Sequence, residues 1–179
     1  MKQYTLATPR LGLRNWLPSD LAPFIKMSRD VDVMQFFPKL LDELESKDFI
    51  ERMQFHFKEY GFCYFAVDEL ATGKFIGFVG LKHQDFKSNY TPSVDIGWRL
   101  MKSAWGKGFA TEAAKSCLDY AFSELKLNEV YSFATVNNIG SETVMKKIGM
   151  NYIDTFNHPY LNDYPELKAC LVYTKNKHE

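Results

Sequence analysis

Apolar residues fall at two kinds of spacing along the chain, and each spacing predicts a type of element. Steps of three and one from Ala114 to Leu125 draw one stripe of an amphipathic helix. A second helical stripe lies between Ser46, the expected N-cap, and Gly61, a residue type that commonly ends helices. Shorter helices are expected over 19–30 and 138–149.

Runs rich in β-branched and aromatic residues alternate with these helices and predict strands. They lie at about 11–16, 62–67, 75–81, 94–100, 130–136, 150–156 and 168–174. We therefore expect an α/β (mixed α+β) fold, in which helices flank a central twisted mixed sheet of about six or seven strands in the order β-α-α-β-β-β-α-β-α-β-β. Residues 1–179 should form a single domain, because no linker, repeat or low-complexity segment interrupts the pattern.

Composition narrows the classes of function. Lys plus Arg and Asp plus Glu both number 22, so the formal net charge is 22 − 22 = 0, which argues against binding nucleic acid or a membrane surface by bulk charge. The sequence shows neither a long apolar run nor a secretory signal pattern, so we expect a cytoplasmic protein. The three cysteines should be buried thiols, and because no metal-ligand spacing is visible we expect no metal site.

The most informative segment joins the 94–100 strand to the 114–125 helix through a glycine turn at 105–108. Glycines let the backbone approach a ligand closely, and the free amides of a helix N-terminus favour an anion. The segment therefore predicts a cradle for a pyrophosphate. It is not a P-loop, and Thr111 stands where a dinucleotide fingerprint needs its third glycine. The alternative interpretation is a glycine-rich connection that holds no ligand.

Several segments together resemble a known family. The strongest are WGKGFATEA at 105–113 and NIGSETVMKKIGM at 138–150, supported by TPRLGLR at 8–14 and by 76–81 and 94–98. With these segments the chain resembles the GNAT superfamily of N-acetyltransferases, and within it the RimJ- and RimL-like branch of ribosomal-protein N-terminal acetyltransferases. The resemblance covers nearly the whole chain. It implies a single GNAT-like domain that uses acetyl-CoA as its acetyl donor.

The resemblance also implies a set of cofactor-binding residues. Backbone amides of the glycine turn and helix start would bind the pyrophosphate; these residues are Gly106, Lys107, Gly108, Phe109, Ala110 and Thr111. The strand end at Leu100 and Met101 would hydrogen-bond the pantetheine arm, Asn138 would reach it from the opposite wall, and Lys147 would touch the outer end of the cofactor. Trp105 departs from the Gln or Arg of the general signature, so its side chain is expected to pack rather than to contact phosphate.

Acetyl transfer needs a neutral amine, a stabilised oxyanion and a protonated leaving thiolate. Asp95 is the first candidate for general base, because it stands where the branch has a Glu, and His83 is the second. The resemblance suggests that Ser141 hydrogen-bonds the departing thiolate, since the tyrosine of other members would fall at Met145. Each has a structural alternative: a strand carboxylate, a solvated loop histidine and a helix-capping serine.

The acceptor is expected to be a primary amine. An α-amine with a pKa of about 8 is partly neutral at pH 7, whereas a lysine-like amine near 10.4 is rarely so, which favours a protein N-terminus. A small amine such as a polyamine, an amino acid or an aminoglycoside stays open, as does a non-catalytic acyl-CoA-binding sensor. The branch often forms dimers, so a homodimer also stays open. Phe36, Phe37 and Pro38 either line an acceptor groove or belong to the core.

Overall fold

One mixed sheet organises the molecule in the computed structural model, which describes residues 2–178. Its eight strands lie in the order β1-β2-β3-β4-β5-β6-β8-β7. The strands are β1 Leu6–Ala7, β2 Leu11–Arg14, β3 Tyr64–Glu69, β4 Lys74–Gln84, β5 Ser93–Leu100, β6 Glu129–Thr135, β7 Asn151–Asn157 and β8 Ala169–Asn176. The helices are α1 Leu21–Ser28, α2 Val31–Met34, α3 Glu43–Tyr60, α4 Phe109–Ser123 and α5 Ile139–Lys147, with 3-10 turns at Pro18–Asp20, Lys102–Ala104 and Pro159–Leu161.

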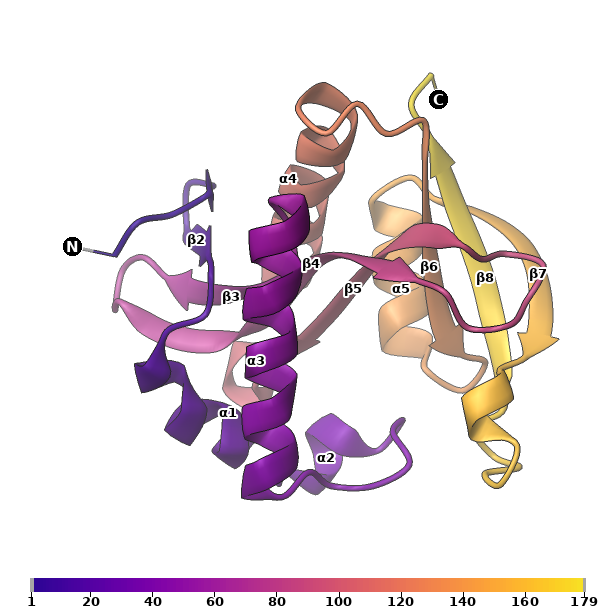
Figure 1. Cartoon of the computed structure of the whole chain (residues 1–179), viewed down its shortest axis with the longest axis horizontal. Helices are drawn as coiled ribbons and strands as arrows, with labels where there is room; N and C mark the ends of the chain where they lie inside the picture. The colour runs from indigo at the N-terminus through magenta and orange to yellow at the C-terminus, as the bar shows by residue number, and fades with distance from the viewer. Residues whose placement is uncertain (1, 179) are drawn as a thin grey trace.

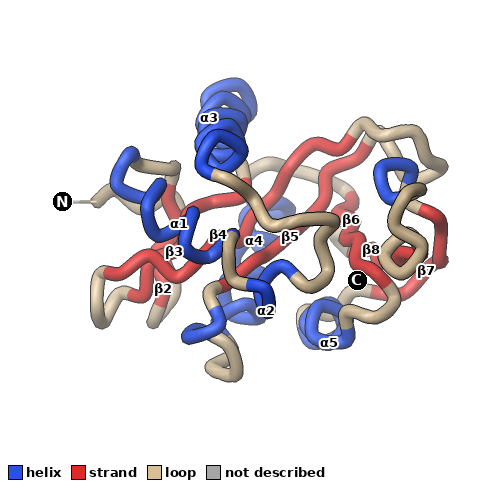
Figure 2. Tube along the Cα trace, turned by 90° about the horizontal axis from the view of Figure 1, so that it is seen from below, coloured by secondary structure: helices blue, strands red, loops and turns tan. Residues whose placement is uncertain are grey.

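The helices cover both sides of the sheet. Figure 1 shows α3 in front of β4 and β5 and α4 behind them. In the view of Figure 2, α3 lies on one side of the strands and α5 on the other. Trp16, Phe24 and Phe49 join Phe78 of β4 in an aromatic cluster on the α1 and α3 side, with ring centroids 4.9 to 6.4 Å apart. On the α4 side, the predicted helical stripe is buried at Ala114, Cys117, Leu118 and Ala121.

The expected fold class is confirmed, but several of its elements differ from those predicted. The sheet has eight strands rather than six or seven, because Leu6–Ala7 is too short to draw a periodic pattern. The helix expected to begin at Ser46 begins at Glu43: Asp42 accepts from Glu45 N–H at 2.8 Å, and Glu45 accepts from Asp42 N–H at 3.0 Å. This Asp-x-x-Glu capping box was the signal that the sequence analysis missed. The segment 19–30 divides into a 3-10 turn and α1.

Parallel pairing in the sheet occurs only between β5 and β6, and it is short. Its register contains one pair, Asp95 with Tyr131. Next to it, the Ser132 hydroxyl donates to the Ile96 carbonyl at 2.9 Å. The β5 to β6 register of the described chain contains no further pair beyond Asp95 and Tyr131, so the strands separate toward the C-terminal end of β5. The sheet therefore opens a wedge between β5 and β6, beside the N-termini of α4 and α5.

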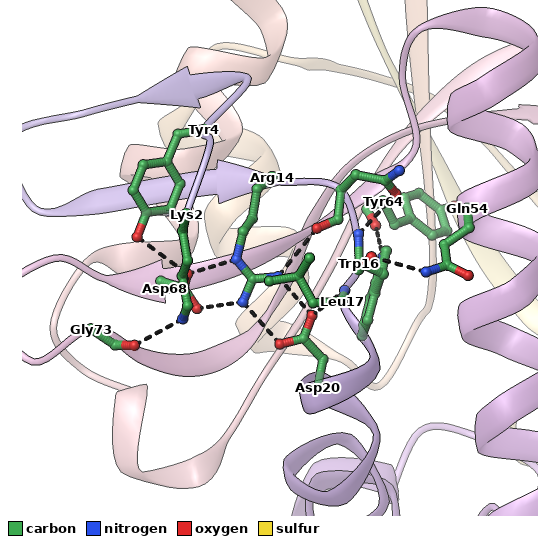
Figure 3. Close-up of polar contacts among 11 residues, drawn as sticks. Lys2, Tyr4, Arg14, Trp16, Leu17, Asp20, Gln54, Tyr64, Asp68 and Gly73 are labelled. Atoms are coloured by element: carbon green, nitrogen blue, oxygen red, sulfur yellow. Dashed lines mark hydrogen bonds and ion pairs between the residues drawn. The ribbon is translucent and has the colours of Figure 1, made fainter.

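A buried ion network ties β2 to β3 and to the turn before α1 (Figure 3). The Arg14 guanidinium donates to Asp68 at 2.8 Å and to Asp20 at 2.6 and 2.9 Å. Arg14, Asp20 and Asp68 are each at most 2% exposed. Burial alone would lower the pKa of Arg14, but the hydrogen bonds that its guanidinium donates to both carboxylates outweigh burial and raise that pKa. Arg14, the one polar side chain of β2, is therefore as buried as the leucines of that strand, unlike a polar residue of an ordinary half-exposed strand.

Candidate active site

The wedge between β5 and β6 is part of a cleft of about 900 Å³. Its walls come from the ends of β5 and β6, the N-terminal turns of α4 and α5, the segment after α2, and the 3-10 turn at 159–161. Most of the predicted site residues line it: Asp95, Leu100, Gly106, Gly108, Phe109, Ala110, Thr111, Asn138, Ser141 and Lys147. His83, Met101 and Lys107 lie outside its lining.

The α4 N-terminus presents unpaired amides to the cleft. Gly108 is the N-cap, with a φ of 78° that favours glycine, and the first amide to bond within the helix is that of Glu112, which donates to the Gly108 carbonyl at 3.0 Å. The amides of Phe109, Ala110 and Thr111 therefore have no acceptor within the helix. Three such donors at the positive end of the helix dipole offer hydrogen bonds of the kind that an anion accepts.

The edge of β5 that faces β6 offers further backbone groups. Along a strand, residues that bond to one neighbour alternate with residues that face the other. Met101 N–H donates to a β4 carbonyl at 2.9 Å, whereas the Ile96 carbonyl accepts from Ser132 of β6. By this alternation Trp98 and Leu100 face the cleft and Met101 does not. Trp98 was not among the predicted residues, because its role follows from strand register rather than from a motif.

Trp105 is held at the strand end rather than at the anion site. Its indole N–H donates to the Leu100 carbonyl at 2.9 Å, while 44% of the residue remains exposed. The indole therefore closes the turn between β5 and α4, in keeping with the packing role expected for it. Leu100 keeps one carbonyl lone pair for another donor.

Thr8 and Arg10, near the N-terminus, form hydrogen bonds with residues of the glycine turn and of the first turn of α4. Thr8 Oγ1 and Arg10 Nε each donate to the Glu112 carboxylate at 2.6 Å, and Arg10 Nη1 donates to the Lys107 carbonyl at 3.0 Å. The Arg10 guanidinium also lies 4.7 Å from the centre of the Phe109 ring. One arginine thus connects both ends of the 107–112 segment. In the sequence, Thr8 and Arg10 stand out only as part of the family resemblance. Their contacts with α4 and the glycine turn could not be predicted, because the partner residues are about one hundred positions away.

Asp95 lies at the closed end of the wedge, in a small polar network. The Tyr64 hydroxyl lies 2.7 and 2.8 Å from its two carboxylate oxygens, and Gln84 Nε2 donates to that hydroxyl at 3.1 Å. Asp95 is 6% exposed, and this burial raises the pKa of its carboxyl to about 6 although the hydrogen bond from Tyr64 lowers it. The Tyr64 ring crosses Gly97, where a Cβ would come within 3.1 Å of it. Sequence reasoning missed Tyr64.

His83 occupies a different groove. It is exposed, and its ring lies 4.4 Å from that of Tyr60 at the end of α3. The imidazole is partly shielded from water, and this partial burial, followed by the charge of Lys82, lowers the pKa of His83. The structure therefore does not bring the second candidate base to the cleft that Asp95 lines.

The opposite wall is the first turn of α5. Asn138 Oδ1 accepts from Ser141 N–H at 3.0 Å, so Asn138 is the capping residue, and the Ser141 side chain is not needed for that role. The Asn138 Nδ2 group stays available as a donor. Met145 is buried at the position where a tyrosine was considered, and Lys147 is exposed at the cleft mouth.

The sheet of this α/β fold has one splayed parallel pair, and the resulting cleft lies beside a glycine-capped helix N-terminus, an arrangement suited to an elongated anionic ligand. Residues 10–151 match the family described as the acetyltransferase (GNAT) domain. Protein YkkB of Bacillus subtilis is 32% identical over 151 residues, which are 84% of this chain and 87% of that protein. The chain therefore belongs to the GNAT family, and it is an acetyltransferase.

Solved structures share the fold. A GNAT-family acetyltransferase from Bacillus anthracis has a TM-score of 0.80 at 23% identity, covering 97% of this chain and 99% of that one. Spermidine N-acetyltransferase from Vibrio cholerae, in complex with CoA and spermine, has a TM-score of 0.73 at 19% identity over 96% and 98%. RimL, a ribosomal L7/L12 α-N-protein acetyltransferase in complex with CoA, has a TM-score of 0.76 at 12% identity over 96% and 97%.

Within 2–178 no group of His, Cys, Asp and Glu side chains is arranged to hold a metal ion. No helix in the same part of the chain has the length and apolar character that crossing a bilayer requires.

Proposed function

We propose that this chain transfers the acetyl group of acetyl-CoA directly to a primary amine, within one complex of enzyme and both substrates. The observation that carries the proposal is the trio of unpaired amides at the α4 N-terminus, placed where β5 and β6 separate. An acyl-enzyme is not favoured, because the one cysteine that lines the cleft, Cys170, is buried and burial raises the pKa of its thiol to about 11.

The cleft residues fit acetyl-CoA along its length. The amides of Phe109, Ala110 and Thr111, with the Gly106-Lys107-Gly108 turn, would hold the pyrophosphate. On one wall, backbone groups of Trp98 and Leu100 would hold the pantetheine arm, in place of Met101. On the other wall Asn138 would donate to it, and Lys147 at the mouth would face the outer phosphate. Bound acetyl-CoA supplies a thioester whose carbonyl the amine attacks.

Two side chains of the chain would move protons. Asp95, with a pKa of about 6, is largely ionised at neutral pH and would take the proton of the attacking amine, directly or through one water. Tyr64 positions that carboxylate. The Ser141 hydroxyl, released from capping by Asn138, would donate to the leaving thiolate. We do not assign this role to His83, because it lines the other groove.

The acceptor we favour is an α-amine, as at a protein N-terminus, because it needs the weaker base. The neighbours named for spermidine and for a ribosomal protein share the fold at 19% and 12% identity, so they do not separate the RimJ- and RimL-like assignment from a small-amine acetyltransferase. A single catalytic domain over 1–179 and a cytoplasmic location remain predictions. Acetyl-CoA binding with no turnover across a panel of amines would favour the acyl-CoA sensor instead.

The substitution Gly108→Glu is expected to abolish acetyl-CoA binding. It places a carboxylate beside the phosphates and a side chain at a φ of 78°. The matched control is Gly73→Glu, which also carries a positive φ, 65°, but lies in the β3 to β4 hairpin. Calorimetry should show affinity lost in the first variant and kept in the second. Equal affinity of the native chain and Gly108→Glu, with both folded, would refute the assignment of the anion site.

The substitution Arg10→Ala is expected to raise the KM for acetyl-CoA about fivefold and to leave kcat nearly unchanged, because the glycine turn loses its outer support. The ion pair with Glu112 is partly exposed, so stability should fall by less than about 1 kcal/mol. Arg10→Lys keeps the charge but cannot bridge Glu112 and the Lys107 carbonyl together, so an intermediate KM is expected. Steady-state kinetics with a thermal melt checks this; an unchanged KM for Arg10→Ala would contradict it.

A further inference from the structure

Arg99 of β5 carries a charge that no group of the described chain pairs. Its Nε and Nη1 atoms are buried without a hydrogen-bond partner. The guanidinium lies 3.8 Å from the centre of the Phe37 ring and 5.3 Å from that of Phe78, so it is fixed between two aromatic faces. Burying unbonded guanidinium donors is costly, and the side chain lines the cleft. A ligand that accepts hydrogen bonds there would remove that cost.

Among residues 2–178, no acidic side chain that lines the cleft forms an ion pair with the Arg99 guanidinium, so the guanidinium can bind an anionic group of a ligand. Apart from Asp95, the only acidic side chain of the described residues that lines the cleft is Asp32, and it pairs with Lys102. Asp95 is bonded by Tyr64 and stands four residues earlier on the same strand, which separates the Cα atoms of the two residues, not their charged groups, by about 13 Å. Burial lowers the pKa of Arg99 to about 10, so it remains a cation at neutral pH.

Arg99 also lies on the side of the sheet away from the anion site. Its partner across the β4 to β5 ladder is Phe78, whose ring packs with Phe24 of α1 and Phe49 of α3. The α4 helix, with its free amides, covers the other side (Figure 1). Phe37, which stacks on Arg99, belongs to the aromatic segment after α2 that lines the cleft and is 37% exposed. The guanidinium therefore faces the acceptor end rather than the phosphates.

We propose that Arg99 binds a carboxylate of the acceptor, so that the amine acetylated by this protein belongs to a molecule with a nearby carboxylate. Asp95 and Arg99 would then hold the two ends of the acceptor on one face of β5, the amine at Asp95 and the carboxylate at Arg99. A polyamine would bring a further positive charge beside an unpaired guanidinium and is disfavoured. The inference rests on the proposed function, since it names the acceptor class of the same cleft. The carboxylate belongs either to a free amino acid or to an acidic side chain at a peptide N-terminus.

Matched acceptors test this proposal. Free amino acids are compared with their amides, tripeptides that begin with Asp or Glu with those that begin with Asn or Gln, and spermidine is included. The native enzyme should prefer the carboxylate member of one series by at least about tenfold in kcat/KM, and the preferred series identifies the source. Arg99→Gln should remove that preference by raising the acceptor KM, and leave the carboxamide twin unchanged. Arg99→Lys should restore part of it.

Calorimetry with acetyl-CoA separates this inference from the proposed function. If Arg99→Gln binds acetyl-CoA like the native chain and loses only carboxylate discrimination, the inference holds. If acetyl-CoA affinity falls with Arg99→Gln, the guanidinium belongs to the cofactor site and the inference is wrong. If the native enzyme acetylates spermidine or carboxamides better than carboxylates, the inference fails while the proposed function stands. If the native chain binds no acetyl-CoA, the proposed function itself fails. A thermal melt verifies folding of both variants.

Discussion

Asp95→Asn is expected to lower kcat by at least about 100-fold and to leave acetyl-CoA affinity unchanged. The amide keeps an acceptor for the Tyr64 hydroxyl but cannot take a proton from the amine. In the native enzyme, kcat/KM should fall below about pH 8, where the α-amine becomes protonated, and more steeply below the Asp95 pKa of about 6, where protonation also removes the base. The variant should keep the limb of the amine and lose the second, steeper limb near pH 6.

Tyr64→Phe is the matched control for the pH profile. The Tyr64 hydroxyl stabilises the ionised carboxylate, so its removal should raise the pKa of Asp95 further and move the acid limb to higher pH. The position of the limb distinguishes a base from a structural carboxylate, because loss of packing alone would lower kcat at every pH without moving it. An Asp95→Asn enzyme with native kcat and a native acid limb would leave the base unassigned.

The same raised pKa has a consequence for stability. The folded-state pKa of Asp95, about 6, lies above the ordinary value of 3.8, so the folded chain binds the proton more tightly than the unfolded chain. This contribution to stability is present below about pH 4 and is lost as the pH rises through 6. At pH 8 the buried carboxylate costs up to about 3 kcal/mol, from about 2 units at 1.36 kcal/mol each. Asp95→Asn should therefore raise Tm at pH 8 more than at pH 5.

The largest loss of stability is expected for Arg14→Met. The substitution keeps much of the side-chain volume but leaves the carboxylates of Asp20 and Asp68 buried without their shared cation. Removing one partner of a buried ion pair costs about 3–5 kcal/mol. For a chain of this length that corresponds to a decrease in Tm of about 6–20 °C, which calorimetry at pH 7 would measure.

Two controls show whether that loss comes from the unpaired carboxylates. Lys2→Met removes a partly exposed partner of Asp68 and should cost less than about 1 kcal/mol. The triple variant Arg14→Met, Asp20→Asn, Asp68→Asn contains no stranded charge and should recover much of the lost stability. A Tm for Arg14→Met that falls no further than that for Lys2→Met would show that the network contributes little.

Local features were predictable because the responsible residues are neighbours in sequence. The α4 stripe, the glycine turn and the Asn138 cap each operate within a few positions, and they place most of the predicted cofactor residues at the cleft. The predicted start of α3 was wrong, although the residues that set the true start are close together in sequence. Asp42 and Glu45 form a capping box that lies outside the apolar stripe from which the helix was predicted.

The sequence by itself determined the class of fold, the glycine turn and the order of the elements other than β1 and α2, because hydrophobic periodicity and backbone freedom are properties of short segments. Only the tertiary structure decided which distant groups meet. Tyr64 reaches Asp95 across 31 positions, Arg10 reaches Glu112 across 102, and Arg99 finds an aromatic partner in Phe37 but no anion. Strand register and helix packing determine which of these groups lie close together. Burial in the folded chain raises the pKa of Asp95, and the fold places no hydrogen-bond acceptor of the described residues beside the buried Nε and Nη1 of Arg99.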